Sequence, residues 1–119
     1  MTTAARYTVE IASKTGVGHY LIDGRGLALY YTTSDRPYYS NLPDETLTSW
    51  PVFYTLDILV PSALTQTDFG IYVRDNGVKQ ATFKGYPLYH FFQDKNKGDT
   101  LGNMLGGVWF LVQPGTPPF

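Results

Sequence analysis

The sequence predicts one all-β domain of two similar β units, packed as a small sandwich or a strongly curved antiparallel sheet. The chain has 119 residues, the usual size of a single domain, and we place all of residues 1–119 in it. Aromatic residues make up 16 % of the chain, and its ten tyrosines suit half-buried strand positions. Charged residues make up only 16 %, against about 25 % in typical domains. The third observation is an internal repeat, described below.

Short runs rich in Val, Ile, Thr, Tyr and Phe, bounded by Gly, Pro, Asn or Asp, predict strands almost throughout the chain. Asn76-Gly77 favours a type I′ hairpin turn because both residues tolerate positive φ. A helix is expected only over 43–50, where Pro43 suits the first turn and two acidic residues suit the positive end of the helix dipole. Strands are expected at 6–12, 18–23, 27–33, 52–58, 69–75, 78–84, 87–92 and 108–112, and a loose tail at 115–119.

The repeat becomes visible when the chain is shifted by 59 positions (89 − 30). This one offset aligns glycine, leucine, tyrosine, aspartate and both tryptophans without a gap, which predicts an internal duplication with pseudo-twofold symmetry. We expect unit one at about 17–62 and unit two at about 68–114. The aligned pairs are Gly26/Gly85, Leu29/Leu88, Tyr30/Tyr89, Asp35/Asp94 and Trp50/Trp109.

The strand that contains Tyr89 carries apolar or aromatic side chains on both faces, so we expect it to be buried on both sides. Asp94 follows that strand, where a carboxylate can accept hydrogen bonds from backbone N–H groups. The motif residues are therefore interpreted as structural: the aspartates end turns and the tryptophans anchor the two half-cores. This set comprises Tyr30, Asp35, Trp50, Tyr89, Phe91, Asp94 and Trp109.

Residues 89–94 fit the pattern Y-x-[FWY]-x-x-D, and with their flanks they resemble a family of predicted secreted lipoproteins described as repeats of unknown function. The resemblance covers roughly residues 7 to 114. It implies an extracytoplasmic β domain, secreted or lipid-anchored, with no defined biochemical role. Unit one departs from the pattern, because Thr32 stands at the aromatic position.

Many members of that family carry a cysteine pair before the Trp-Pro, where this chain has Leu42 and Thr46. We expect packing to hold the 36–50 loop in place of that disulfide. The resemblance also implies a signal sequence and often a lipidated cysteine. The sequence contains neither, so we expect that it begins at the mature domain with an added Met1.

Composition bears on several function classes. A net charge of −1 without a basic block lacks the electrostatic signature of nucleic-acid binders. No apolar run is long enough to span a membrane. With no cysteine, the chain offers no thiol nucleophile, and it has no G-x-S-x-G motif. We therefore expect that it is not an enzyme and needs no cofactor.

The leading expectation is a non-catalytic module that binds a protein or cell-surface component, or a second copy of itself. Tyr38 and Tyr39, in a loop outside every expected strand, are the candidate partner-binding residues. They could equally fold back over the core. The alternative function is a copper or haem carrier in extracytoplasmic electron transfer, because imidazole and thioether ligands suit both groups. Its candidate ligands are His19, His90 and Met104.

Overall fold

The computed structural model describes residues 7–115, and in this range the protein is all-β with one short α-helix and two 3-10 turns. The expected Met1 start and most of the expected tail therefore lie outside the described residues. The strands are β1 (Val9–Lys14), β2 (Gly18–Asp23), β3 (Tyr30–Thr32), β4 (Phe69–Val73), β5 (Lys79–Phe83), β6 (Tyr86–Pro87) and β7 (Trp109–Leu111), the helix is α1 (Thr46–Ser49), and the 3-10 turns are Gln66–Asp68 and Leu105–Gly107.

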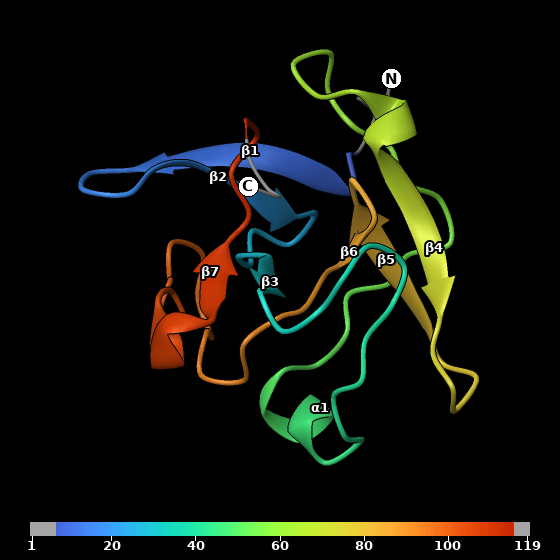
Figure 1. Ribbon diagram of the computed structural model, residues 1–119. Helices are drawn as coiled ribbons and strands as arrows, with labels where there is room; N and C mark the ends of the chain where they lie inside the picture. Colours follow the sequence, from blue (N-terminus) through green and yellow to red (C-terminus); the bar gives the residue numbers. More distant parts are fainter. Residues whose placement is uncertain (1–6, 116–119) are drawn as a thin grey trace.

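The strands form three small antiparallel sheets rather than one curved sheet. β1 pairs with β2, β3 pairs with β7, and β4, β5 and β6 form the third sheet. Figure 1 shows the β1–β2 hairpin and the β4–β5 hairpin on different sides of the central β3–β7 pair. The expected all-β single domain is confirmed.

Three sequence expectations about local structure are wrong. The strand expected at 87–92 is reduced to Pro87 at the end of β6 and bridges at Tyr89, because the N–H groups after Pro87 donate to carbonyls on several different segments. The strand expected at 52–58 is reduced to a bridge between Val52 and Tyr89. The next residue, Phe53, donates its N–H to Leu88 O and accepts from Ala81 N–H, so its two backbone groups bond to different segments and the pairing goes no further. The turn after β4 is not type I′: Gly77 has positive φ (86°), whereas Asn76 is not among the positive-φ residues. The N–H of Gly77 closes the turn on Arg74 O, so glycine alone supplies the left-handed residue.

Contacts in the two halves follow the same pattern. Val9 pairs with Asp23 in the first hairpin, and Phe69 pairs with Phe83 in the second, which are shifts of 60 positions (69 − 9 and 83 − 23). At the centre, Tyr30 and Tyr89 donate their N–H groups to each other's carbonyl oxygen, both at 2.8 Å. An evolutionary duplication, and the expected unit boundaries, stay predictions of the sequence.

Each half also supplies backbone to the other. Phe53 N–H donates to Leu88 O at 3.0 Å, and Val112 N–H donates to Leu29 O at 3.1 Å. Both residues of the second bond lie 59 positions from their counterparts in the first (112 − 53 and 88 − 29). The segment after each tryptophan therefore bonds to the segment next to the motif tyrosine of the opposite half. Each half thus depends on backbone groups of the other.

The core has two hydrophobic clusters, and the second contains most of the motif residues. Trp50 and Trp109 stack in parallel, with ring centroids 3.7 Å apart and an interplanar angle of 2°. Phe91 lies 4.4 Å from Trp50, and the Tyr89 ring meets Trp109 edge-on at 5.1 Å. Such aromatic contacts contribute about 0.5–1.5 kcal/mol each beyond area burial. The stacked tryptophans therefore bring aromatic residues of both halves together within one of the two clusters.

We predict that Gly102→Ala destabilises the protein by about 1–3 kcal/mol, the usual effect of overpacking a core. A Cβ at Gly102 would lie 2.7 Å from the Trp50 ring and 3.0 Å from the Phe91 ring. Urea denaturation measures the change, with Gly115→Ala as the control, because no atom lies within 4 Å of a Cβ at Gly115. Equal stability of the two variants would contradict this account of the core.

Candidate functional site

The motif tyrosines and aspartates form hydrogen bonds that cross between the two halves. The Tyr30 hydroxyl donates to Asp94 Oδ2 at 2.6 Å, and the Tyr89 hydroxyl donates to Asp35 Oδ2 at 2.7 Å. Both tyrosines are fully buried, and both aspartates are buried. Each tyrosine therefore bonds the aspartate of the other half, not the one five positions after it.

The Tyr30–Asp94 pair is completed by backbone donors. Leu101 N–H donates to Asp94 Oδ1 at 2.9 Å, and Gly102 N–H donates to the Tyr30 hydroxyl oxygen at 3.2 Å. Burial, followed by the hydrogen bond to Asp94, raises the pKa of Tyr30 far above its ordinary value. The pair is a closed structural unit with both side chains held inside the core.

The Tyr89–Asp35 pair is completed by side chains instead. The Tyr89 oxygen lies 3.1 Å from Ser40 Oγ and accepts from Arg74 Nη1 at 3.2 Å. Arg74 is buried and also donates to Gln80 Oε1 at 2.7 Å. Burial, followed by the nearby charge of Asp35, raises the pKa of Tyr89 to about 12. Sequence reasoning missed Arg74 and Ser40, because nothing near them in the chain marks them as buried.

We predict that Tyr30→Phe and Tyr89→Phe each lower the free energy of unfolding by about 1–3 kcal/mol, since each leaves a buried carboxylate oxygen without its donor. The measurement is urea denaturation, with Tyr54→Phe as the matched control. Tyr54 is partly exposed (38 %), so its hydroxyl should matter little. If the three variants lost the same stability, the crossed pairs would not be the structural lock described here.

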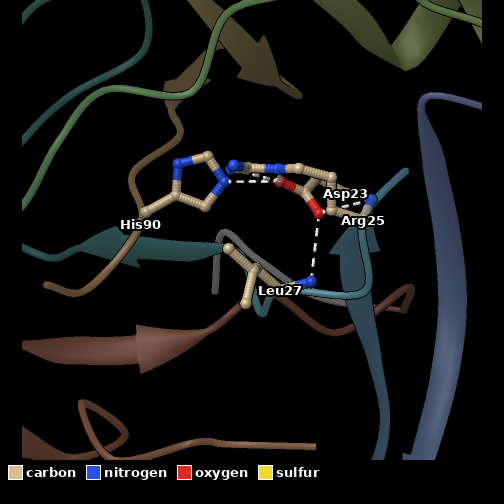
Figure 2. Close-up of polar contacts among 4 residues, drawn as sticks. All are labelled: Asp23, Arg25, Leu27 and His90. Atoms are coloured by element: carbon tan, nitrogen blue, oxygen red, sulfur yellow. Dashed lines mark hydrogen bonds and ion pairs between the residues drawn. The ribbon is translucent and has the colours of Figure 1, made fainter. Parts of the chain in front are cut away.

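A different polar group lines a cavity of about 830 Å³. His90 Nε2 lies 2.8 Å from Asp23 Oδ2, and Arg25 Nη2 donates to the same oxygen at 3.2 Å. The other oxygen, Asp23 Oδ1, accepts from the N–H groups of Arg25 and Leu27 at 2.9 and 3.0 Å. Figure 2 shows the carboxylate between the imidazole on one side and the Arg25 and Leu27 backbone on the other.

The Asp23 carboxylate is ionised at neutral pH. Its burial alone raises its pKa, but the His90 hydrogen bond, the two backbone donors and the charge of His90 outweigh burial and lower the pKa to about 2. Because an ionised carboxylate only accepts hydrogen bonds, the proton in this contact belongs to His90 Nε2. Neutral His90 therefore keeps a lone pair on Nδ1.

The pKa of Asp23 lies below its ordinary 3.8, so the stability that this carboxylate contributes is present above about pH 4 and lost as pH falls towards 2. We predict that Asp23→Asn removes about 2 kcal/mol of this acid-dependent stability. Urea midpoints measured from pH 2 to pH 6 test this, with the exposed Asp75→Asn as control. If the urea midpoint of Asp23→Asn fell between pH 4 and pH 2 as much as that of the native protein, the role given to Asp23 would be contradicted.

The candidate metal ligands are not gathered at one place. His19 is exposed near the turn of the first hairpin, where it pairs with Ser13, whereas His90 contacts Asp23 at the other end of β2, about 13 Å further along the strand. Met104 is exposed (67 %). Within residues 7–115, no group of three or more His, Cys, Asp and Glu side chains could hold a metal ion. No contact among these residues favours a copper or haem carrier.

The candidate partner-binding tyrosines lie at the surface. Tyr38 is 55 % exposed and Tyr39 is 50 % exposed. One side of the Tyr38 ring nevertheless packs on the sheet: a Cβ at Gly70 would lie 2.9 Å from its hydroxyl, and a Cβ at Gly85 would lie 3.3 Å from its ring. Tyr38 therefore covers the sheet with one side of its ring and keeps an open face, and partner binding by this loop stays a prediction.

The 36–50 loop, which lacks the disulfide common in the resembled family, is held by other contacts. Arg74 Nη2 donates to Leu42 O at 3.3 Å, and Ser40 N–H donates to the Tyr72 hydroxyl at 3.1 Å. Leu42 also packs against the tryptophan cluster. The expectation that packing replaces the disulfide agrees with these contacts.

Fold and motif together define a small all-β protein whose two halves are joined by two buried tyrosine–aspartate hydrogen bonds. Residues 70–113 match the model of a family described as a secreted repeat of unknown function, which confirms the family resemblance over the second unit. No curated protein and no solved structure matches the chain. In the described part of the protein, every helix is too short or too polar to cross a bilayer.

Proposed function

We propose that this chain is a non-catalytic extracytoplasmic module that binds a protein or other cell-surface component through Tyr38 and Tyr39. The observation that carries the proposal is the backbone of Tyr38, which has φ 56°. Its N–H donates to Gly85 O at 2.7 Å, and this bond holds the loop against the sheet. A tyrosine in the left-handed region costs free energy, and such strain tends to be retained at functional sites.

The strained backbone holds an aromatic ring in place before any partner arrives. One side of the ring lies on two glycines and the other faces solvent. A side chain that is already ordered loses little entropy on binding, and tyrosine is enriched at the energetic centres of interfaces. Tyr39 stands next to it, in a bridge with Arg36. The pair thus offers a preformed aromatic surface.

Two further points support this reading. The hydroxyls of both motif tyrosines and Oδ2 of both motif aspartates take part in buried internal hydrogen bonds, so the motif leaves little chemistry for catalysis. The matched family is described as secreted, which favours a position outside the cytoplasm, either released or held by a lipid anchor. The partner is then a surface component of the producing cell or a second copy of this chain.

We predict that the double variant Tyr38→Ala/Tyr39→Ala weakens binding by roughly 30-fold or more, as expected when a hot spot worth about 2 kcal/mol is removed. The measurement is saturable binding of labelled protein to the surface of the producing cells, with sedimentation velocity to detect self-association. Phe92→Ala is the matched control, since Phe92 is also aromatic and exposed (46 %). Unchanged binding in the tyrosine variant, or equal loss in the control, would overturn the proposal.

A further inference from the structure

The cavity beside His90 contains polar groups that neither the motif nor the proposed partner surface uses. Its lining includes the polar residues Asp23, Arg25 and His90 and the aromatic residues Tyr7, Phe53 and Tyr54. Tyr7 and Tyr54 are 37 % and 38 % exposed, so their rings remain accessible from the cavity side. Phe53 is buried and meets the His90 ring edge-on at 5.5 Å, which fixes the imidazole on one side.

His90 lines the cavity, and its Nε2 is the ring nitrogen that contacts Asp23. Figure 2 shows the other ring nitrogen, Nδ1, on the side of the imidazole that faces away from Asp23 and Arg25. Asp23 receives donors on both oxygens, so it orients the ring and has no free position for a ligand. A molecule in the cavity would therefore meet the Nδ1 lone pair, which accepts a hydrogen bond.

Arg25 presents donors to the same space. Its side chain is 72 % exposed, and only part of the guanidinium is used by Asp23 Oδ2. A guanidinium carries five N–H donors, so several remain for an oxygen of a ligand. Glu10 also lines the cavity and adds a further acceptor. A ligand that matches this set both donates and accepts hydrogen bonds at neighbouring atoms, as hydroxyl groups do.

The charges select against charged ligands. Asp23 and Glu10 together outweigh Arg25 when His90 is neutral, which disfavours a phosphate or carboxylate. A cation would meet the Arg25 guanidinium in the cavity lining. A neutral ring with hydroxyl groups and an apolar face meets neither penalty and can stack on an exposed tyrosine. The volume of about 830 Å³ lies within the range of small-molecule sites.

We propose that this cavity binds a saccharide unit, with His90 Nδ1 and Glu10 accepting from its hydroxyl groups, Arg25 donating to its oxygens, and Tyr7 or Tyr54 stacking on its ring. The site is separate from the Tyr38–Tyr39 surface. Its test therefore succeeds or fails independently of the partner-binding proposal. A free saccharide and the terminal unit of a surface glycan present the same chemistry to this cavity.

The experiment is a titration of the ¹⁵N-labelled protein, followed by NMR, with D-glucose, D-galactose, N-acetylglucosamine and maltose at millimolar concentrations. Inorganic phosphate and putrescine serve as the anionic and cationic probes. We expect saturable shifts for at least one neutral sugar, centred on His90, Arg25 and Tyr54, and none for phosphate or putrescine. Binding of the winning sugar as a terminal residue on a glycan array then distinguishes a surface glycan from a free sugar.

Two variants make the result specific. His90→Gln can still donate to Asp23 through its amide N–H, but it replaces the fixed Nδ1 acceptor of the ring with a carbonyl oxygen on a flexible side chain. Arg25→Gln removes the guanidinium donors. Each is expected to weaken sugar binding at least roughly tenfold, the loss of about one hydrogen bond. The matched controls, His19→Gln and Arg36→Gln, alter exposed residues outside the cavity lining and should leave binding unchanged.

Three outcomes would overturn the proposal: no shift with any of the four sugars, stronger binding of phosphate or putrescine than of every sugar, or equal sugar affinity in His90→Gln and native protein. The spectrum of each variant without ligand shows whether it is folded. If His90→Gln is unfolded, Arg25→Gln decides, because Arg25 is largely exposed and its loss should leave the fold intact.

Discussion

The crossed hydrogen bonds between Tyr30 and Asp94 and between Tyr89 and Asp35 are the constraint on which the rest of the structure depends. A buried carboxylate without a donor costs several kcal/mol, so neither aspartate can be buried unless the opposite half delivers its tyrosine. The backbones of Tyr30 and Tyr89 also exchange hydrogen bonds, and the two tryptophans stack on each other. Neither half can therefore complete its core alone. Because the Tyr–Asp bonds cross between the two halves, the seven short strands that the structure describes over residues 7–115, in three small sheets, form one domain.

The symmetry of the lock is incomplete, and the differences have identifiable causes. Gly102 supplies an N–H to the Tyr30 hydroxyl, but the position 59 residues earlier (102 − 59) is Pro43, which has no N–H. Ser40 and Arg74 contact the Tyr89 hydroxyl instead. Asp35 Oδ1 remains buried without a hydrogen-bond partner among residues 7–115. Burial raises the pKa of Asp35 despite the nearby Ser40 hydroxyl, the bond from Tyr89 and the charge of Arg74. The surface features follow the same logic, because the exposed tyrosine loop and the His90 cavity both involve residues that the 59-position shift does not repeat.

Much of this fold was predictable, because strand-forming residues and turn residues alternate along the chain and the repeat shows in the sequence. The burial of the motif was predictable from the two apolar faces of the strand expected at 87–92. Phe92, at the end of that expected strand, is an exception, because it is 46 % exposed. The crossing of the pairs was not: a five-residue spacing between tyrosine and aspartate does not show which half each bonds. The contact between Asp23 and His90 was not predictable, because the two residues lie 67 positions apart in the chain. The expected strand at 52–58 was wrong because of contacts that are distant in the sequence. The N–H and the carbonyl of Phe53 bond to two different segments, and the pairing ends there.

The central claim is that each motif tyrosine is coupled to the aspartate of the other half, and double-mutant cycles measure this directly. Tyr30→Phe is combined with Asp94→Asn in one cycle and with Asp35→Asn in a second, with urea unfolding as the readout in both. The crossed arrangement predicts a coupling free energy of about 1–3 kcal/mol for Tyr30 with Asp94 and less than about 0.5 kcal/mol for Tyr30 with Asp35. Stronger coupling of Tyr30 to Asp35, or no coupling in either cycle, would contradict the interlocked structure described here.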